Sequence, residues 1–457
     1  MTLKAIDPAT GKLIAEYDEM SRDEAELAVE AAHQAFLDWR KRSFAERAKP
    51  MRECARLLRA RARQYGRLMA QEMGKPLTGA MAEVEKCADA CEYFADNAEK
   101  LLSPEPVEMA GTKSFVTFQP IGVVLAVMPW NFPFWQVFRF LAPGLMAGNA
   151  GVLKHASNVP GCAIAIEELC RHSGFPENLF RTLMIGSRAV DRIIEHRCVR
   201  AVTLTGSDAA GRAVAAKAGA MLKKTVLELG GSDAYLILAD ADVEQAATIA
   251  TKARLVNSGQ SCIAGKRFIV VEPLREAFEA AFVAKMQAAK VGDPMDEVAE
   301  VGPMARHDLR DALHKQVQGS ISRGARLLCG GEIPDNPGAY YPPTVLTDVR
   351  KTMPAYDEEL FGPVAAVIVA KDDEDAVALA NDSPFGLGAG IITADLARGE
   401  TLAVEAIEAG SVFVNGAVAS NVRLPFGGIK DSGYGRELSQ YGIKEFVNIK
   451  TVVVAQP

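Results

Sequence analysis

Apolar and polar positions in the first hundred residues follow a helical spacing. The segment 24–39, EAELAVEAAHQAFLDW, places apolar side chains three and four residues apart, which is typical of an amphipathic helix. Ser21 followed by Glu24 has the sequence of a capping box, so we expect a helix to begin there. Pro50 suits the first turn of another helix. Residues 21–101 are therefore predicted to be helical.

The pattern changes near residue 114 to short β-branched runs that alternate with helical ones. Strands are predicted at 115–119, 122–128, 150–154, 180–185, 201–206 and 225–231, with helices at 137–148, 161–174, 189–196 and 209–224. After residue 262 further strands are predicted at 267–271, 325–331, 365–370, 389–394 and 410–416, with helices near 274–290 and 373–381. Such alternation indicates βαβ units, and therefore two α/β lobes with mostly parallel sheets.

The last segment, NIKTVVVAQP at 448–457, is strand-like but has no predicted partner next to it. A strand needs an edge to pair with. We expect it to pair with 113–119 or with another subunit.

Charge and composition disfavour several classes of function. The chain has 457 residues, 51 basic and 58 acidic, and a net charge of -7, which disfavours nucleic acid as a partner. The uncharged run 114–138 is interrupted by Pro120, Pro129 and Pro133, so it is not expected to span a membrane. We read no signal peptide at the N-terminus and expect a cytoplasmic protein.

The eight cysteines form no CxxC pair, which fits reduced thiols. Cys87 and Cys91, four apart on a predicted helix, are interpreted as core residues. Cys262 differs, because its neighbours in NSGQSC are small and polar and provide no metal ligands. We expect no metal site, so Cys262 is either a packing residue or a nucleophile.

Polar residues at four predicted strand ends could carry chemistry, since ligands bind at the carboxyl ends of parallel strands. Asn131 could donate to an oxyanion or form an Asx turn. Lys154 could reach a ribose or phosphate, or be solvated. Ser207, after Gly206, could bind pyrophosphate at a helix N-terminus or be a plain N-cap. Glu228 could be a general base or a salt-bridged carboxylate.

Taken together, the motifs resemble the aldehyde dehydrogenase family over essentially the whole chain. The motifs occur in one order: PWNFP, TGS with a later Gly211, LELGG, NSGQSC, EELFGPV, NDSPFGL and PFGGIKDSGYGRE. Within the family the chain is most similar to the bacterial semialdehyde branch. The resemblance implies an α/β fold of two Rossmann-type lobes and a small β oligomerisation flap. The implied units are a cofactor-binding domain (1–101 and 121–229), a catalytic domain (230–447) and the flap (102–120 and 448–457).

The resemblance assigns the nucleophile to Cys262, which would attack an aldehyde carbon to give a thiohemiacetal and then a thioester. The Asn131 amide and the Cys262 backbone N–H would hold the oxyanion, and Glu228 would activate water. No histidine is available as a partner base, so we hypothesise that the cofactor ring and backbone dipoles lower the thiol pKa.

The cofactor implied is NAD or NADP. Many NAD-preferring relatives carry Glu where this chain has Ser157, so NADP should be tolerated. The implied cofactor-binding residues are Trp130, Lys154, Ser157, Gly206, Ser207, Glu359 and Phe361.

Arg139 lies eight residues after Asn131, and the semialdehyde branch has arginine at this position. A guanidinium at the mouth of an aldehyde tunnel suits a distal carboxylate, although an arginine paired with an acid elsewhere is the alternative. A second arginine of the branch is absent, since position 256 is Val. The predicted substrate-binding residues are Arg139, Trp135, Ser420 and Asn421.

The resemblance favours oxidation of succinate semialdehyde to succinate. Alternatives are glutarate semialdehyde, a broader range of aldehydes, a thiol esterase, and a relative that has lost catalysis. A homodimer or homotetramer is expected, without a nucleic-acid or membrane partner.

Overall fold

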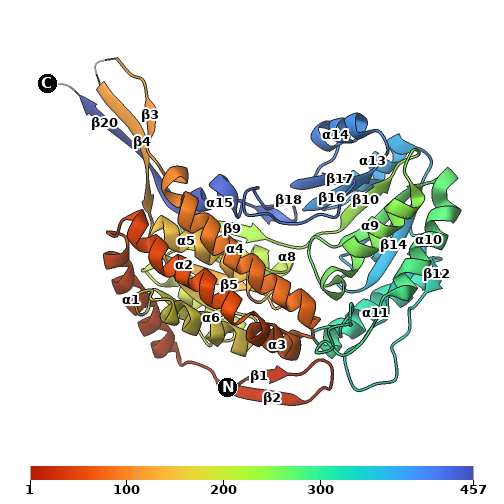
Figure 1. Ribbon diagram of the computed structural model, residues 1–457, viewed down its shortest axis with the longest axis horizontal. Coiled ribbons are helices and arrows are strands. Elements are labelled where there is room, and N and C mark those ends of the chain that lie inside the picture. Colours follow the sequence, from red (N-terminus) through yellow and green to blue (C-terminus); the bar gives the residue numbers. More distant parts are fainter. Residues whose placement is uncertain (1, 111, 456–457) are drawn as a thin grey trace.

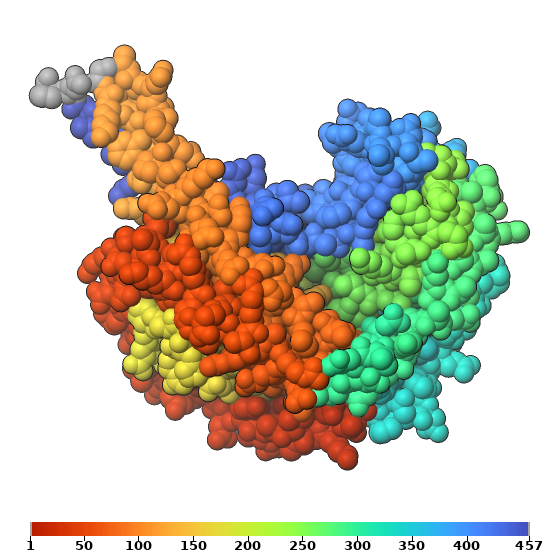
Figure 2. Space-filling view, in the orientation of Figure 1, coloured from red at the N-terminus to blue at the C-terminus, as the bar shows by residue number. Residues whose placement is uncertain are grey.

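The computed structural model describes residues 2–110 and 112–455. Two α/β lobes lie side by side, and a thin flap projects from the end of the first lobe away from the second (Figure 1). The space-filling view shows the same flap standing out from the body (Figure 2). The fold class predicted from the sequence, two α/β lobes plus a small β flap, is confirmed.

The first lobe is built on a six-stranded sheet in the order β19-β9-β8-β5-β6-β7. Its strands are β5 (Val123–Met128), β6 (Ala150–His155), β7 (Phe180–Thr182), β8 (Val199–Thr205), β9 (Lys224–Glu228) and β19 (Gly433–Tyr434). The pairs among β5 to β9 are parallel, and β19 joins β9 in the antiparallel sense.

The helices of this lobe are α1 (Arg22–Trp39), α2 (Phe44–Ala60), α3 (Ala62–Met73), α4 (Leu77–Leu101), α5 (Trp135–Ala147), α6 (Pro160–His172), α7 (Val190–Glu195), α8 (Asp208–Ala220) and α15 (Ser439–Glu445), with a 3-10 turn at Ser187–Ala189. A hairpin of β1 (Thr2–Ile6) and β2 (Leu13–Asp18) precedes them.

The predicted capping box at the start of α1 is confirmed, because Ser21 and Glu24 exchange both of its hydrogen bonds. The placement of Pro50 in a first turn is wrong. A second capping box, formed by Ser43 and Glu46, starts α2 at Phe44, so Pro50 lies inside the helix.

The second lobe has a seven-stranded sheet in the order β12-β13-β14-β11-β10-β16-β17. Its strands are β10 (Asp233–Ile237), β11 (Gly265–Val271), β12 (Arg326–Cys329), β13 (Thr344–Thr347), β14 (Val364–Ala370), β16 (Gly388–Ile392) and β17 (Ser411–Val414). Its helices are α9 (Val243–Leu255), α10 (Arg275–Ala288), α11 (His307–Ser322), α12 (Pro354–Asp357), α13 (Asp373–Asn381) and α14 (Leu396–Glu405), with 3-10 turns at Val256–Gly259 and Glu272–Leu274. A small pair joins β15 (Phe385–Gly386) to β18 (Ile429–Lys430).

The flap consists of β3 (Glu105–Val107), β4 (Thr112–Pro120) and β20 (Val447–Ala455), in the order β20-β4-β3. β20 pairs antiparallel with β4 along its whole length. The predicted flap ranges also include residues 111, 456 and 457, which lie outside the described residues. The unit boundaries stay predictions, but β19 and α15, from the predicted catalytic segment, pack on the first lobe.

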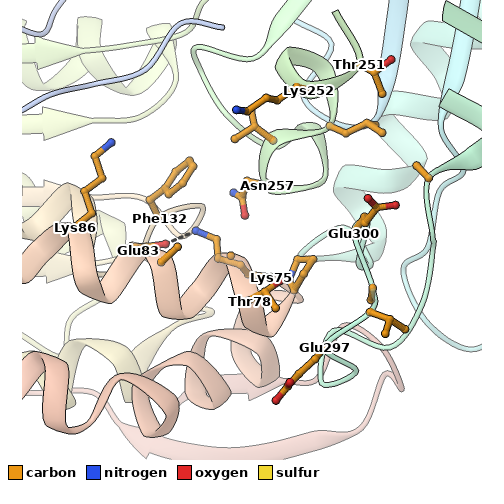
Figure 3. A pocket seen from close by; sticks show the side chains of 18 of the residues that line it. Lys75, Thr78, Glu83, Lys86, Phe132, Thr251, Lys252, Asn257, Glu297 and Glu300 are labelled. Atoms are coloured by element: carbon orange, nitrogen blue, oxygen red, sulfur yellow. Dashed lines mark hydrogen bonds and ion pairs between the residues drawn. The ribbon is translucent and has the colours of Figure 1, made fainter. Parts of the chain in front are cut away.

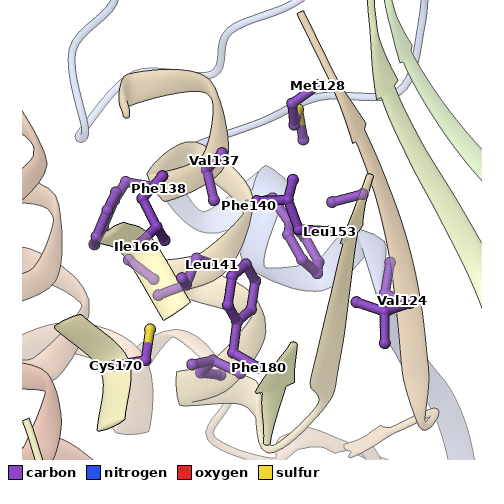
Figure 4. Packing of buried hydrophobic residues seen from close by; sticks show 14 of the residues in the cluster. Val124, Met128, Val137, Phe138, Phe140, Leu141, Leu153, Ile166, Cys170 and Phe180 are labelled. Carbon is purple, nitrogen blue, oxygen red and sulfur yellow. The ribbon is translucent and has the colours of Figure 1, made fainter. Parts of the chain in front are cut away.

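Helix α5 follows the loop that carries Asn131, and burial holds this helix in place. Every residue of α5 is buried. Figure 4 shows Phe138, Phe140 and Leu141 of α5 packed between the sheet strands and α6. Burying large apolar side chains of this kind contributes about 1.5–3 kcal/mol each. The start of α5, with Asn131 just before it, is therefore held firmly against the sheet.

Candidate active site

Cys262, Asn131 and Glu228 come from three strand ends and meet between the lobes. Asn131 follows β5, Glu228 ends β9, and Cys262 precedes β11. The Asn131 amide Nδ2 donates to the Gln260 carbonyl at 3.1 Å, and the Asn257 amide donates back to the Asn131 carbonyl at 2.7 Å. These bonds join the loop of the cysteine to the loop after β5.

The loop before Cys262 has an unusual backbone. Asn257, Ser258 and Gly259 have φ values of 53°, 56° and 75°, all in the left-handed region. A Cβ on Gly259 would lie 2.2 Å from the Gly362 carbonyl oxygen, so only glycine fits. The buried Arg254 guanidinium donates to the Gly259 carbonyl at 2.7 Å. Such strain persists only when the surroundings enforce it, and it is typical of functional loops.

Cys262 differs in exposure from the other cysteines. All eight lie in the described part of the chain as free thiols; seven are buried and Cys262 is partly exposed. Burial of its sulfur still raises the pKa of Cys262 to about 12, although Arg139 and Lys266 oppose that shift. The thiol is therefore protonated at neutral pH in this structure. That a bound cofactor lowers the pKa of Cys262 stays a hypothesis.

Two donors near the sulfur lack a partner. The Cys262 backbone N–H makes no hydrogen bond with a described residue. Asn131 uses its amide nitrogen once, toward Gln260, which leaves one of its two N–H groups available. Lys266 is fully buried and donates to the carbonyls of Ser261 and Cys262 at 2.8 and 2.5 Å, which orients the peptide after the nucleophile. This arrangement can hold an oxyanion.

The Glu228 carboxyl is 1% exposed, and neither of its oxygens has a hydrogen-bond partner among the described residues. Burial, followed by the nearby Glu437 carboxylate, raises the pKa of Glu228 well above its usual value. A Cβ on Gly427 would lie 2.7 Å from Oε1 of Glu228, so only glycine lets the backbone approach the carboxyl this closely. The group is suited to holding and releasing a proton.

The sequence left two alternatives for Arg139, a guanidinium at the mouth of an aldehyde tunnel or one paired with an acid. The Arg139 side chain is 3% exposed and its Nε lies 2.7 Å from Oε2 of Glu437, as the second alternative has it, and a contact with substrate stays a prediction. The guanidinium also stacks over the Phe426 ring at 4.5 Å. A buried arginine requires a counter-charge, and Glu437 provides it. Glu437 was missed as a site residue, although it ends the SGYGRE motif quoted from the sequence.

Residues predicted to hold the adenosine end of a cofactor lie on the first lobe. Lys154, at the end of β6, is 8% exposed, and its side-chain ammonium has no hydrogen bond or ion pair with a described residue. Burial lowers the pKa of Lys154. Ser157 is exposed. Ser207 is the N-cap of α8 and accepts from the Ala210 N–H at 3.3 Å, directly after Gly206. A buried cation without a partner and an open helix N-terminus fit a ribose and a pyrophosphate.

Residues predicted at the nicotinamide end lie on the second lobe and at the end of β5. Glu359 lies 3.3 Å from the Lys266 ammonium, and its Oε1 accepts from the Gly231 N–H at 3.1 Å. The Trp130 and Phe361 rings meet edge to face with centroids 5.7 Å apart. These contacts place a carboxylate and an aromatic wall within reach of the cysteine loop.

A cavity of about 820 Å³, shown in Figure 3, is lined by residues of α4, of the segment after Asn131 and of the cysteine loop. Phe132 and Trp135 form part of its wall, together with Asn257 from the cysteine loop and Lys86 from α4. The Trp135 indole Nε1 donates to Ser420 Oγ at 3.1 Å, so these two predicted residues are in contact. Asn421 is exposed and its Oδ1 accepts from the Arg423 N–H at 3.0 Å, and its contact with substrate stays a prediction. Lys86 was not predicted.

Among the described residues no group of three or more His, Cys, Asp or Glu side chains could hold a metal ion. No helix in 2–110 or 112–455 is both long and apolar enough to cross a bilayer.

Comparison with known proteins gives a consistent result. The model of the aldehyde dehydrogenase family matches residues 1–452. The chain is 49% identical, over all of both chains, to a probable succinate-semialdehyde dehydrogenase [NADP(+)] of Synechocystis sp.. It is 48% identical, again over all of both chains, to succinate-semialdehyde dehydrogenase [NADP(+)] 1 of Mycobacterium tuberculosis. A solved succinic semialdehyde dehydrogenase of Streptococcus pyogenes in complex with NADP+ is 38% identical, with a TM-score of 0.97, covering 99% of this chain and 100% of that one.

Proposed function

Because this chain belongs to the aldehyde dehydrogenase family, we propose that it oxidises succinate semialdehyde to succinate with NADP or NAD. The observation that carries the proposal is the partly exposed Cys262, beside two unpaired oxyanion donors, in a chain 49% identical to a probable enzyme of that name. The alternative is a wider range of aldehydes, or glutarate semialdehyde.

The Cys262 sulfur forms a bond to the aldehyde carbon, and the thiol proton is lost to solvent or to a nearby base. The negative charge that develops on the aldehyde oxygen is held by the Asn131 amide and the Cys262 N–H. When bound, the nicotinamide cofactor supplies the hydride acceptor that oxidation requires. The acyl group then remains on sulfur as a thioester.

Glu228 acts in the second half of the reaction. Its carboxylate takes a proton from a water that attacks the thioester carbon, and the C–S bond breaks to release the carboxylic acid and the thiol. The raised pKa of Glu228 makes it a better proton acceptor than an ordinary carboxylate once ionised.

The residues that would hold the cofactor are Lys154 and Ser157 at the adenosine ribose, Gly206 and Ser207 at the pyrophosphate, and Glu359 with Phe361 and Trp130 at the nicotinamide end. The buried Lys154 without a partner fits this role. Ser157 presents no negative charge, so a 2′-phosphate meets no repulsion there.

Initial rates of NADPH and NADH formation test the proposal, with succinate semialdehyde, glutarate semialdehyde and butanal as substrates. Succinate semialdehyde and butanal share four carbons and differ in the distal carboxylate. We expect the semialdehyde to have the higher kcat/KM by more than about tenfold, which is roughly 1.4 kcal/mol. Equal kcat/KM values for butanal and succinate semialdehyde would contradict the proposal and indicate a broad aldehyde dehydrogenase. Cys262→Ala is the control and should give no reduced cofactor.

We also propose a homodimer or homotetramer in which the flap joins subunits. The flap projects from the body and exposes apolar side chains at Ile449, Val453, Val454 and Val107. Exposed apolar patches of this kind favour association. Light scattering after gel filtration measures the assembly, and a monomer at micromolar concentration would refute it. Eight free thiols support the proposed cytoplasmic location.

A further inference from the structure

Lys266 is a fully buried lysine that contacts the cysteine loop. It is the second residue of β11, and its ammonium donates to the carbonyl oxygens of Ser261 and Cys262 at 2.8 and 2.5 Å. It also lies 3.3 Å from Oε1 of Glu359. An ammonium has three N–H groups, so each of them has an acceptor here. Because burying a charge is costly, two hydrogen bonds to the same turn point to a role in that turn.

These contacts fix the direction of the peptide group that joins Ser261 to Cys262. The Ser261 carbonyl also accepts from the Ala264 N–H at 3.1 Å, so both lone pairs of this oxygen are used. The peptide is trans, which places its C=O and N–H on opposite sides of one plane. The Cys262 N–H therefore points away from Lys266, and it has no partner among the described residues.

The peptide after the nucleophile is held as well. The Cys262 carbonyl accepts from Lys266, and a Cβ on Gly231 would lie 2.7 Å from this oxygen. The Gly231 N–H in turn donates to Oε1 of Glu359 at 3.1 Å. The peptide groups on both sides of Cys262 are thus bound to one cation, and neither can rotate without losing its hydrogen bond to that cation.

A cation at one end of a peptide group strengthens the donor at the other end. Hydrogen bonds in a chain polarise one another, by about 10–30% for each bond. Lys266 draws electron density toward the Ser261 oxygen, which makes the Cys262 N–H a stronger donor. The oxyanion of an aldehyde addition forms next to that N–H. The ammonium charge is also weakly screened, because it acts through the interior of the protein.

We propose that Lys266 is a positioning residue for the oxyanion site: it fixes and polarises the peptide between Ser261 and Cys262, so that the Cys262 N–H stabilises the negative charge of the thiohemiacetal. The inference rests on the proposed function, in which Cys262 attacks an aldehyde. Since Lys266 is fully buried, it acts through this peptide group and does not touch the substrate.

The charge of Lys266 acts on the sulfur as well as on the oxyanion. Burial raises the pKa of Cys262 to about 12. Of the neighbouring charges, Arg139 and Lys266 oppose that shift, and the carboxylates of Glu359 and Glu228 add to it. Loss of Lys266 therefore raises the thiol pKa further and lowers the thiolate fraction. A test has to separate this effect from the effect on the oxyanion.

Two reactions of the Cys262 sulfur, both without cofactor, make this separation. Alkylation by iodoacetamide displaces iodide from a saturated carbon and forms no oxyanion, so its rate reports the thiolate and its accessibility. Acylation by p-nitrophenyl acetate forms an S–C bond, passes through a tetrahedral oxyanion and breaks the ester C–O bond, which releases p-nitrophenolate. The ratio of the two rate constants isolates the oxyanion. Leaving out the cofactor also removes the contribution of Glu359 to cofactor binding.

Three variants grade the contact. Lys266→Met removes the hydrogen bonds and the charge, Lys266→Gln keeps an N–H donor without the charge, and Lys266→Arg keeps the charge. Arg267→Met is the matched control, because Arg267 is also a buried cation of β11 but donates to backbone carbonyls outside the cysteine loop. Melting temperatures report folding. Glu359, which loses its partner in Lys266→Met, is 21% exposed, so no fully buried charge is left behind.

For Lys266→Met at pH 8 we expect acylation of Cys262 to slow about 10- to 100-fold more than alkylation. Complete loss of an oxyanion donor costs about 100- to 1,000-fold, and here the donor is weakened but kept. Lys266→Gln should lie between Lys266→Met and wild type, Lys266→Arg should keep most of the ratio, and Arg267→Met should leave it unchanged. The values of kcat/KM with succinate semialdehyde and NADP should follow the same order.

Three results would overturn the inference. The first is an unchanged ratio in folded Lys266→Met, or in Lys266→Gln if the methionine variant does not fold. The second is an equal fall of the ratio in Arg267→Met, and the third is a wild-type Cys262 that is alkylated but not acylated. If wild type instead reduces neither cofactor with any of the three aldehydes, the proposed function fails, and the ratio still tests the Lys266 contact because it needs no cofactor.

Discussion

The Arg139 guanidinium lies 2.7 Å from the Glu437 carboxylate, and both side chains are at most 4% exposed. The pair lies next to the reactive centre, because Arg139 and Glu437 each influence the pKa of Glu228. A buried pair of this kind positions neighbouring groups, and breaking it is costly because one charge stays behind without compensation.

Replacing Arg139 should therefore harm the whole enzyme. We expect Arg139→Ala to destabilise the fold by about 3–5 kcal/mol, because Glu437 remains buried without a counter-charge. Activity with succinate semialdehyde and with butanal should fall together. Thermal unfolding and the two kcat/KM values measure this, and Arg139→Met combined with Glu437→Leu should recover much of the stability. A stable variant that loses activity only with succinate semialdehyde would show that Arg139 binds the substrate carboxylate.

Replacing Glu228 by glutamine should raise the stability of the fold and lower its activity. The pKa of Glu228 in the folded chain is raised above its unfolded value of about 4.3. Its stability contribution is therefore complete below about pH 4.3 and is lost as the pH rises toward the raised value. Glu228→Gln should melt higher than wild type at pH 7–8, with a smaller difference near pH 5, while turnover falls roughly 100- to 10,000-fold.

Glu99 provides the matched control, because it is exposed and makes no ion pair with a described residue, so Glu99→Gln should show neither an effect on turnover nor a gain in melting temperature. A Glu228→Gln protein that melts lower than wild type at pH 8 would contradict a raised pKa.

The thiol of Cys262 should react slowly in the free enzyme at neutral pH. Since burial raises its pKa to about 12, alkylation by iodoacetamide should accelerate steadily up to at least about pH 10, without a plateau near neutrality. Mass spectrometry should find the label on Cys262, because the other cysteines are buried. The same curve with NADP present tests whether the cofactor lowers the pKa, and identical curves would refute that hypothesis.

The backbone before the nucleophile should not tolerate a side chain. Gly259→Ala places a Cβ 2.2 Å from the Gly362 carbonyl oxygen at a φ of 75°. We expect a loss of at least about 2 kcal/mol and little activity, since both sterics and backbone conformation oppose the change. Gly219→Ala is the control, because nothing lies within 4 Å of its Cβ and it is helical, so it should be neutral or stabilising. An active, stable Gly259→Ala protein would contradict this prediction and show that the loop can shift to make room for the Cβ.

Ser157 should decide how well NADP is used. Wild type is expected to accept both cofactors, and a preference for NAD beyond about a hundredfold, roughly 2.7 kcal/mol, would contradict this. Ser157→Glu introduces a charge that repels the 2′-phosphate, so kcat/KM with NADP should fall by about tenfold or more while the value with NAD changes little. Ser157→Ala is the matched control and should retain NADP.

The sequence by itself determined most of the elements and identified the family. Helical spacing and the Ser21–Glu24 box fixed α1, and β-branched runs fixed β5, β6 and β8, because these signals are local. The strand β10, Asp233–Ile237, escaped prediction, since a short, fully buried apolar run has no periodicity to separate strand from helix. Cys262 stood out because its small polar neighbours are unusual for a packing cysteine.

Tertiary structure decided which charges are free and which are paired. Arg139 and Glu437 are 298 positions apart in the numbering (437 minus 139), and Lys86 and Ser420 are 334 apart. No local pattern can report such contacts, because side-chain partners are selected when the sheets and helices pack. The sequence left Arg139 either open to a substrate carboxylate or paired with an acid, and only the packing of the folded chain paired it with Glu437.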